Sequence, residues 1–581
     1  MSKQKPSLPK GTRDFGPAEM NKRHFILETI KKVYQKYGYA PIETPAMENL
    51  SVLQGKYGDE GDQLLFKILD SGDYIEKARN ASVKRKFNID SFNFITDVFY
   101  QLLLEMREKK KELTEVEDVF NSEIFSIRIK KNTSSFTKIP TELRDQFFKN
   151  VLDAIINIEN EISNKRLLTS TDEEFNSQFD VSRQEFINNF TDFLIKSNLD
   201  NFNELLSSSL TQDISEKGLR YDLTVPFARF VVMNQNELTF PFKRYQIQPV
   251  WRADKPQKGR YREFFQCDAD TIGTDSLLCE AEIVLMIKEV FTLLQAKKPG
   301  SLDYSIKINN RKILSGLVEV LGETGRETDF AVAIDKLDKI GQDKVKEELK
   351  AKGFSEAALA GMDAIFNLSG PTKFQLSQLQ TILENSATGL KGIEELQEML
   401  AILGAFGEDI EELELDITLA RGLSYYTGAI FEVKPNNVKM GSISGGGRYD
   451  GLTDNFGLPG VSGVGISFGV DRIYDVLNEL ALYPTDQITS TDVLITSFDQ
   501  ESWNYGLQVL AQLRKADIKS ELYPSAIKIK KQMKYGNDKQ IPFVILIGSE
   551  EVKSGQLTFK DMLKGEQLSL STQEIIEFFN K

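Results

Sequence analysis

Arginine, amide and carboxylate side chains recur at alternate positions in residues 245–273, a pattern suited to binding a charged ligand on a sheet surface. Arg252 is followed two residues later by a carboxylate, and Gln266, Asp268 and Asp270 are spaced two residues apart. Because alternate residues of a strand point to the same face, each group would share one face of its strand. Arginine can bind phosphate or carboxylate through paired hydrogen bonds, while carboxylates and amides accept from ligand donors. Packing explains such a surface poorly, so we expect a binding site there.

A basic loop separates these two polar groups. Polar and apolar residues alternate in 246–251 and again, with aromatic residues, in 261–270, which predicts two antiparallel strands joined by a long turn. Four basic side chains surround Gly259 in this turn: Lys255, Lys258, Arg260 and Arg262. Their charge suits a phosphate or an RNA end, although the tip of a hairpin is also commonly a solvated cluster of charges.

The length and composition of the chain indicate a soluble globular protein with more than one domain. Its 581 residues predict two to four domains, and contents of 40% hydrophobic and 27% charged residues are typical of folded soluble proteins. No apolar run is long enough to span a bilayer, and residues 1–17 lack the hydrophobic core of a signal peptide. We therefore expect a cytoplasmic protein without a membrane partner.

Histidine and cysteine are too rare for several common kinds of active site. Cys267 and Cys279 cannot form a disulfide framework or, by themselves, a zinc site, and we expect reduced thiols. The single histidine, His24, is expected on the surface of a helix, which leaves none for a Ser-His-Asp triad. Chemistry must then depend on Arg, Asp, Glu, Lys, Tyr or carboxylate-held metal. The net charge of -14 disfavours a general nucleic-acid coat protein and restricts RNA contacts to local basic patches.

The first part of the chain predicts a helix, an edge strand and a long insertion. Apolar residues recur at helical spacing in 20–38. Pro41 and Pro45 interrupt the extended segment 39–50 and confine it to a sheet edge or an interface. Residues 75–208 contain no glycine and carry apolar residues at helical spacing, so we predict a mainly helical module without catalytic residues.

Strand and helix signals alternate in the second half of the chain. Asp222 and Thr224 alternate with apolar neighbours, and residues 312–403 predict several short helices separated by glycines. The glycine triplet 445–447 permits close backbone approach and usually marks a tight strand end. Arg472 follows a run of small residues at the beginning of a predicted helix.

The last ninety or so residues predict a separate α/β domain after a linker at 482–491. Strands are expected at 492–496 and 543–547, and a helix at 503–516. A basic cluster in this domain comprises Lys528, Lys530, Lys531 and Lys534. A solvated helix face and an RNA contact are about equally good explanations of this cluster.

Together these segments resemble the class II aminoacyl-tRNA synthetases, and among them the histidyl-tRNA synthetase family. PIETPAMENL resembles motif 1, the dimer-forming element, residues 245–273 resemble motif 2, and GVGISFGVDRI resembles motif 3. ARGLSYYTG and RYDLT resemble the histidine-specific segments of the family. The implied fold class is α+β: an antiparallel sheet flanked by helices, with a helical insertion and a C-terminal α/β anticodon-binding domain.

The resemblance divides the chain into a catalytic core in three parts, two insertions and a C-terminal domain. The expected boundaries are 1–74 (motif 1), 75–208 (helical insertion of unknown role), 209–311 (motif 2), 312–404 (helical insertion near the tRNA acceptor stem), 405–482 (histidine-specific segment and motif 3) and 490–581 (anticodon-binding domain).

The resemblance implies a homodimeric histidine-tRNA ligase that forms histidyl-adenylate from L-histidine and ATP and transfers histidine to the 3′ end of tRNA(His). Arg252 and Arg421 would be the catalytic cations that stabilise charge at the α-phosphate. Arg472 would clamp the γ-phosphate and lie over adenine, Asp254 would also belong to the ATP site, and Mg²⁺ would bridge the remaining phosphate oxygens.

The resemblance also implies a site for the amino acid and contacts for the tRNA. Asp270 and Tyr426, with Tyr425 beside it, would bind the imidazole ring, while Asp222, Thr224 and Gln266 would bind the amino and carboxylate groups. The full set of histidine-binding residues is Asp222, Leu223, Thr224, Arg252, Gln266, Asp270, Arg421, Tyr425 and Tyr426. The tRNA-binding residues are Lys258, Arg260, Lys528 and Lys530.

Two departures and three alternatives accompany this resemblance. Asp254 stands where motif 2 commonly has glutamate, and Ser424 stands where many relatives have aspartate, so altered support of the tyrosines is expected. One alternative is a catalytically silent relative such as the regulatory subunit of ATP phosphoribosyltransferase, which typically lacks the C-terminal domain and the phosphate-binding arginines. Another is an RNA-binding or signalling module built on an inactive core. A third is another class II specificity.

Overall fold

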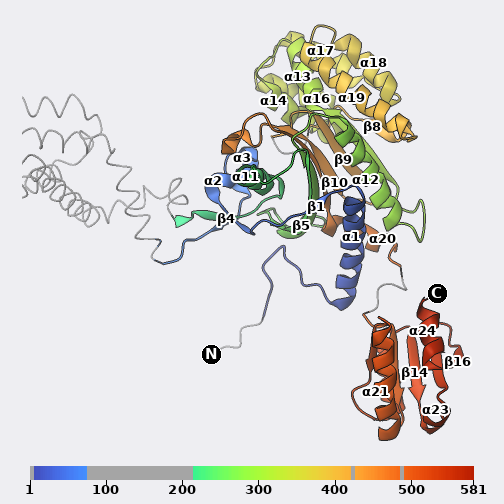
Figure 1. Ribbon diagram of the computed structural model, residues 1–581. Coiled ribbons are helices and arrows are strands. Elements are labelled where there is room, and N and C mark those ends of the chain that lie inside the picture. The colour runs from blue at the N-terminus through green and yellow to red at the C-terminus, as the bar shows by residue number, and fades with distance from the viewer. Residues whose placement is uncertain (1–5, 73, 75–213, 421–424, 485–489, 581) are drawn as a thin grey trace, which may run out of the picture. The chain divides into compact units, whose positions relative to one another are not determined.

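The computed structural model describes residues 6–72, 74, 214–420, 425–484 and 490–580 (Figure 1). The predicted helical insertion at 75–208 therefore lies outside the described residues, as do Arg421 and Ser424. Each remaining part of the chain is described by itself.

An eight-stranded sheet forms the centre of the larger part of the described chain. Its order is β1-β5-β6-β11-β10-β9-β7-β8. The strands are β1 Ala40–Pro41, β5 Phe242–Trp251, β6 Glu263–Ile272, β11 Ser462–Gly469, β10 Ser444–Asp450, β9 Ala429–Pro435, β7 Tyr304–Asn310 and β8 Leu413–Leu415. The six strands from β5 to β7 in this order pair antiparallel, and β1 and β8 add in parallel at the two edges. This is the antiparallel sheet that the resemblance predicts.

The predicted hairpin is the β5–β6 pair, and its register follows the alternation in the sequence. Gln266 lies opposite Gln248, and Asp270 lies opposite Arg244. The prolines also act as expected, because β1 is an edge strand. They interrupt the predicted strand at 39–50 more strongly than expected, since only Ala40–Pro41 and β2 Met47–Asn49 are extended.

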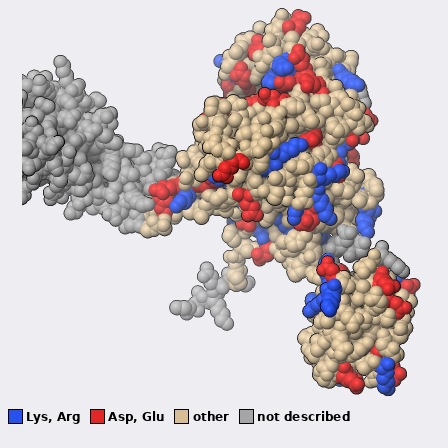
Figure 2. Space-filling view, in the orientation of Figure 1, with Lys and Arg blue, Asp and Glu red and all other residues tan. Residues whose placement is uncertain are grey.

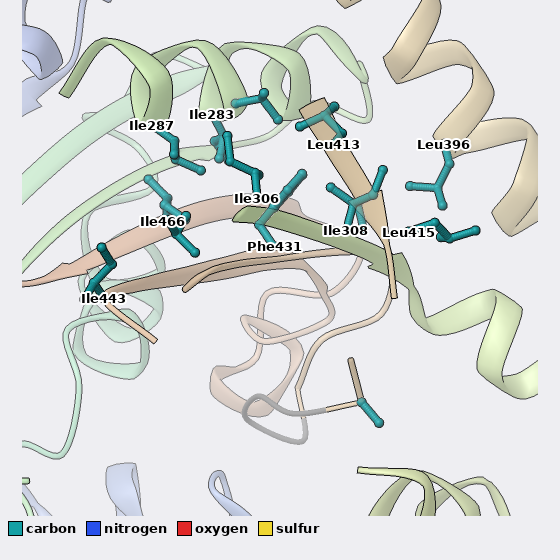
Figure 3. Close-up of a cluster of buried hydrophobic side chains, with 14 of the residues drawn as sticks. Ile283, Ile287, Ile306, Ile308, Leu396, Leu413, Leu415, Phe431, Ile443 and Ile466 are labelled. Carbon is teal, nitrogen blue, oxygen red and sulfur yellow. The ribbon is translucent and has the colours of Figure 1, made fainter. Parts of the chain in front are cut away.

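Several helices pack on the large sheet and bury its apolar core, and three of them contact β6 or β11. They are α1 Pro17–Lys36, α12 Leu278–Leu294 and α20 Val470–Glu479. Figure 3 shows Ile283 and Ile287 of α12 above Ile306 of β7 and Ile466 of β11, all fully or almost fully buried. Burial of such side chains at about 1.5–3 kcal/mol each holds the strands in place. The prediction of an exposed His24 is confirmed, and both cysteines are free and buried.

The predicted short helices between 312 and 403 are present (Figure 1). They are α13 Arg311–Val320, α14 Glu327–Ile334, α15 Leu337–Ile340, α16 Gln342–Ala351, α17 Glu356–Phe366, α18 Thr372–Ile382 and α19 Ala387–Ala405. Helices α13 and α19 approach closely at Gly316, where a Cβ atom would lie 2.5 Å from the Cα of Gly389.

Two local patterns differ from expectation. The alternation at Asp222 and Thr224 is not part of a strand, because α11 Thr224–Asn234 begins at the threonine. The glycine triplet is not a strand end, because residues 445–447 pair with β9 on one side and β11 on the other. A Cβ at Gly446 would lie 2.1 Å from the carbonyl oxygen of Gly465, so the close approach is between two strands.

The C-terminal residues form a second sheet with its own apolar core, as predicted. Its order is β13-β12-β14-β15-β16, and β12, β13 and β14 are parallel. The elements are β12 Val493–Ser497, α21 Gln500–Lys515, β13 Ser520–Leu522, α22 Ile529–Asp538, β14 Phe543–Ile547, α23 Ser549–Ser554, β15 Leu557–Asp561, β16 Gln567–Leu570 and α24 Thr572–Asn580. The short elements elsewhere are α2 Leu50–Leu53, α3 Gly58–Gln63, β3 Lys67–Ile68 and β4 Lys217–Leu219. Among the described helices, none has the length and apolar character needed to cross a membrane.

Candidate active site

A cavity of about 310 Å³ lies against β6, β9, β10, β11 and the beginning of α20. Nine of the residues selected from the sequence line it: Asp222, Thr224, Arg252, Asp254, Arg260, Gln266, Tyr425, Tyr426 and Arg472. The β5–β6 hairpin and α20 are far apart in sequence, and β11 joins them because it pairs with β6 and leads directly into α20.

Arginines gather at the end of the cavity nearest the hairpin loop. Arg252 follows β5 directly, and its Nε donates to the carbonyl of Tyr221 at 3.1 Å while the guanidinium lies 4.3 Å from the centre of that ring. Arg472 lies in the first turn of α20 and donates to the carbonyls of Gly259 at 2.7 Å and Ser442 at 2.6 Å. Burial, together with the nearby Arg252 and Arg260, lowers the pKa of Arg472. This concentration of positive charge is suited to an anion such as a polyphosphate.

The carboxylate beside Arg472 fixes the beginning of α20. Asp471 accepts from Arg13 at 2.5 Å, from Arg23 at 2.7 Å and from the backbone amide of Phe265 at 3.0 Å. Arg13 also stacks over the ring of Tyr261, 3.6 Å from its centre. The N-terminal segment therefore ties α20 to the hairpin loop and holds Arg472 at the cavity.

Carboxylates and phenols gather at the other end. Asp222 accepts from the hydroxyls of Tyr57 and Tyr425, both at 3.1 Å, and from the backbone amide of Val225 at 3.2 Å. Burial raises the pKa of Asp222, while these hydrogen bonds and Arg252 oppose the shift. The rings of Tyr425 and Tyr426 meet edge to face with centroids 5.1 Å apart. Such groups can hold a small polar ligand by several hydrogen bonds.

The floor of this end is a buried charged cluster on β5 and β6. Arg244 is completely buried and lies 2.7 Å from the carboxylate of Asp270, which also accepts from the hydroxyl of Tyr449 at 2.7 Å. Asp268 lines the cavity, and burial raises its pKa to about 7, although the charge of Arg244 acts in the opposite direction. The two carboxylates therefore share one guanidinium.

The remaining selected residues lie elsewhere. Asp270 is on the shared face of β6 but does not line the cavity, and Leu223 meets the site through its carbonyl, which accepts from Arg244 at 3.1 Å. Lys258 is exposed and pairs with Glu479 at 2.7 Å. Lys528 and Lys530 are exposed at the beginning of α22 in the C-terminal sheet domain. The roles assigned to all these residues, and to Arg421, stay predictions.

Sequence reasoning assigned no role to Arg244, Asp268, Arg13 or Asp471. The first two carried a usable signal, because Arg244 continues the polar alternation of Gln246 and Gln248, and Asp268 lies between two selected residues. The contact of Arg13 with Asp471 spans 458 positions and had no local signal.

Comparison with known proteins bears on the identity of this site. The sequence profile of the histidyl-tRNA synthetase family matches residues 11–75 and 206–473, and an anticodon binding domain profile matches residues 492–581. A histidine-tRNA ligase of Cytophaga hutchinsonii is 46% identical over 99% of both chains, and one of Bacteroides fragilis is 44% identical over 99% of both.

Solved structures show the same fold at lower identity. Histidyl-tRNA synthetase from Nostoc sp. PCC 7120 aligns with a TM-score of 0.66 and 24% identity, covering 100% of this chain and 99% of that one. An ATP phosphoribosyltransferase regulatory subunit/histidyl-tRNA synthetase from Bacillus halodurans C aligns with a TM-score of 0.57 and 16% identity, covering 94% and 100%. The fold alone does not separate these two kinds of protein, but the full-length similarity to the ligases and the arginine-lined cavity agree. The chain belongs to the histidyl-tRNA synthetase family of aminoacyl-tRNA ligases.

Proposed function

We propose that this chain activates L-histidine with ATP and transfers it to the 3′ end of tRNA(His). The observation that carries the proposal is one cavity with arginines at one end and a slot of carboxylates and phenols at the other. A catalytically silent or purely RNA-binding relative would not need Arg252 and Arg472 to meet in one cavity, so that alternative is not favoured.

Activation requires the histidine carboxylate to attack the α-phosphorus of ATP. A bond forms between a carboxylate oxygen and phosphorus, the bond from phosphorus to the bridging oxygen breaks, and pyrophosphate leaves with the electron pair. Negative charge accumulates on the α-phosphate oxygens, and fixed cations lower the barrier because they need no reorganisation. Arg252 and Arg421 are our candidates for these cations. A general base is unnecessary, since the attacking carboxylate is already ionised at neutral pH.

The nucleotide occupies the arginine end in this proposal. Arg472 lies over the adenine and binds the γ-phosphate, and its two backbone hydrogen bonds keep the guanidinium in place. Asp254, which pairs with Arg260 at 3.5 Å, and Glu432 are two of the carboxylates that line the cavity. Among the described residues no three potential ligands cluster into a metal site. Asp254 and Glu432 would suit Mg²⁺, which commonly uses one or two carboxylates together with substrate phosphates and would neutralise phosphate charge.

The amino acid occupies the slot of carboxylates and phenols. Asp222, Thr224 and Gln266 are proposed to bind the amino and carboxylate groups, with Leu223 supporting them through its backbone. Tyr425, Tyr426 and Asp270 are proposed for the ring side. A site that matches the donors and acceptors of a polar substrate can reject analogues by about 10⁴-fold, because buried groups would be left unpaired.

The tRNA contacts, the homodimer and the cellular location are proposed from features of the protein surface and from the resemblance. Acidic and basic side chains are interspersed on the face that Figure 2 shows, so we assign RNA contacts to local groups. These are Lys258 and Arg260 for the acceptor end, and Lys528 and Lys530 in the anticodon-binding domain. The edge position of β1 and the exposure of Met47, which begins β2 later in the same segment, support a homodimer through the motif 1 segment. We place the enzyme in the cytoplasm.

Amino-acid-dependent exchange of pyrophosphate into ATP tests this function. We expect exchange with histidine only. Arg252→Ala should lower it by about 10²-fold or more without changing the far-ultraviolet circular dichroism, because removal of one fixed transition-state charge has this scale. Lys258→Ala serves as a control, since that side chain lies outside the cavity and should leave exchange intact. Exchange driven by another amino acid, or none with any, would contradict the proposal.

A further inference from the structure

The carboxylate of Asp222 is held through both of its oxygens, and only one of them is contacted from the cavity. Oδ2 accepts from the hydroxyl of Tyr425, which lines the cavity. Oδ1 accepts from the hydroxyl of Tyr57 at 3.1 Å and from the backbone amide of Val225 at 3.2 Å, and neither residue belongs to the cavity lining. Tyr57 therefore contacts a cavity-lining carboxylate without reaching the cavity itself.

Segment 52–66 places Tyr57 against this carboxylate. Tyr57 is the N-cap residue of α3, and its side chain, which is 6% exposed, belongs to an apolar cluster with Leu53 and Leu65. Gly61 leaves room for it, because a Cβ at Gly61 would lie 2.4 Å from the Cβ of Tyr57. A buried hydroxyl that loses its partner costs about 1–3 kcal/mol, so this hydroxyl is committed to Asp222.

The same segment also supports the arginine end of the cavity. The rings of Tyr57 and Tyr221 have centroids 4.6 Å apart, and the guanidinium of Arg252 lies 4.3 Å from the centre of the Tyr221 ring. The carbonyl of Leu64 accepts from the backbone amide of Ala253, the residue after Arg252, at 2.9 Å. Segment 52–66 thus contacts the supports of both substrate ends, but its one hydrogen bond to a cavity carboxylate within the described residues is that of Tyr57.

The number of donors around Asp222 decides which oxygen is left for a ligand. An ionised carboxylate has about four acceptor sites, and three of them are filled by donors within the described part of the chain. Two of these donors share Oδ1, so the remaining site is on Oδ2, beside Tyr425. Burial raises the pKa of Asp222, and the hydrogen bonds from Tyr57 and Tyr425 are among the interactions that lower it. They therefore favour the ionised form, which a substrate ammonium group requires.

We propose that Tyr57 is a positioning residue for the amino acid, which fills Oδ1 of Asp222 and thereby directs Oδ2 at the ammonium group of the substrate. This inference rests on the proposed histidine activation, which assigns Asp222 to that part of the substrate. Without the Tyr57 hydroxyl, Oδ1 has one donor fewer and the carboxylate can turn away from the ammonium group. Tyr57 contacts neither substrate and acts through Asp222.

The test compares ligands that carry the ammonium group with one that lacks it. Histidine and histidinol, in which a hydroxymethyl group replaces the carboxylate, have the ammonium group, and 3-(imidazol-4-yl)propionate does not. For Tyr57→Phe, pyrophosphate exchange should show a KM for histidine and an inhibition constant of histidinol raised about 5- to 10-fold, the scale of one hydrogen bond. The inhibition constant of imidazolylpropionate, the KM for ATP and kcat should change less than about twofold, because only ground-state binding of the ammonium group is lost.

Tyr483→Phe is the matched control. The Tyr483 hydroxyl is also buried and donates to the carbonyl of Tyr474 at 3.2 Å, but Tyr483 does not line the cavity. Its removal should change none of these values.

Three results would overturn the inference. A loss for imidazolylpropionate as large as that for histidine would make Tyr57 a structural residue, and an unchanged KM for histidine would exclude its action through Asp222. If Tyr57→Phe does not fold, Gly61→Ala, whose Cβ must displace the Tyr57 side chain, has to show the same selective loss for the ammonium ligands, and absence of that selectivity refutes the proposal. Absence of histidine-dependent exchange in the unsubstituted enzyme would instead refute the function itself.

Discussion

Replacement of Asp268 by asparagine should make the ligand-free protein more stable at neutral and alkaline pH. The pKa of this carboxyl is raised to about 7 in the folded chain, mainly by burial, against about 3.9 in an unfolded chain. The folded state therefore binds more protons than the unfolded state between these values, and stability falls as the pH rises through this window. Asparagine resembles the protonated carboxyl in size and has no charge to bury, so the variant avoids this loss.

The size of the effect follows from the two pKa values. About three units at 1.36 kcal/mol each give up to about 4 kcal/mol at pH 8, and the same relation gives about 1.5 kcal/mol at pH 5. Unfolding entropy near 2.1 cal/mol/K per residue, over a catalytic unit of roughly 330 residues, converts these values to shifts in Tm of about 6 °C and 2 °C.

Thermal denaturation of the full chain, followed by circular dichroism at pH 8 and pH 5, measures these shifts. Asp275→Asn provides the control, because its side chain is exposed and no burial is relieved. A Tm for Asp268→Asn at or below that of the unsubstituted protein at pH 8 would refute the reasoning. An equal rise at both pH values would also refute it, because the stabilisation would then not come from ionisation.

Two further substitutions test the sheet and the C-terminal domain. Gly446→Ala should lower the Tm by about 10 °C or more or prevent folding, because its Cβ would lie 2.1 Å from the carbonyl oxygen of Gly465. Gly445→Ala should be tolerated, because its Cβ would lie 3.5 Å from the carbonyl oxygen of Phe431. Thermal denaturation of both variants measures the difference. Phe498→Ala should lower kcat/KM for tRNA about tenfold while pyrophosphate exchange is unchanged. The ring of Phe498 is 56% exposed at the carboxyl end of β12, and stacking of such a ring on a base contributes about 1–3 kcal/mol. An unchanged aminoacylation rate would count against the contact.

The parts of the fold that could be predicted are those with a signal inside one short segment. The hairpin followed from alternation in 246–251 and 261–270, and the helices between 312 and 403 followed from apolar spacing. Residues 445–447 were predicted to mark a strand end, because a local sequence does not reveal which strands pair on either side of it. The reason for glycine at 446 is a carbonyl of another strand, and that is a property of the assembled sheet.

The site residues likewise comprise some that a local sequence pattern could predict and others that depend on the assembled sheet. Arg252 and Arg472 could be selected because each lies in a recognisable segment, and the sheet brings both to one cavity. The pairing of Arg244 with Asp270 depends on the register of β5 against β6 across a long loop, which alternation alone leaves open. Sequence spacing could therefore place Asp268 and Asp270 on one face, but it could not decide which of them receives the guanidinium and which faces the cavity.

The burial of Asp268 links the stability of the ligand-free protein to substrate binding. Because the effect of burial on Asp268 outweighs the charge of Arg244, the ionised Asp268 destabilises the empty protein. A ligand that donates a hydrogen bond to Asp268 recovers part of this free energy on binding. Histidine should therefore stabilise the unsubstituted protein against heat more than it stabilises Asp268→Asn, so that the variant is the more stable one empty and loses this advantage as histidine saturates the site. If histidine raised the Tm of both proteins equally, the buried charge of Asp268 would be unrelated to substrate binding, even if its effect on stability were as large as expected.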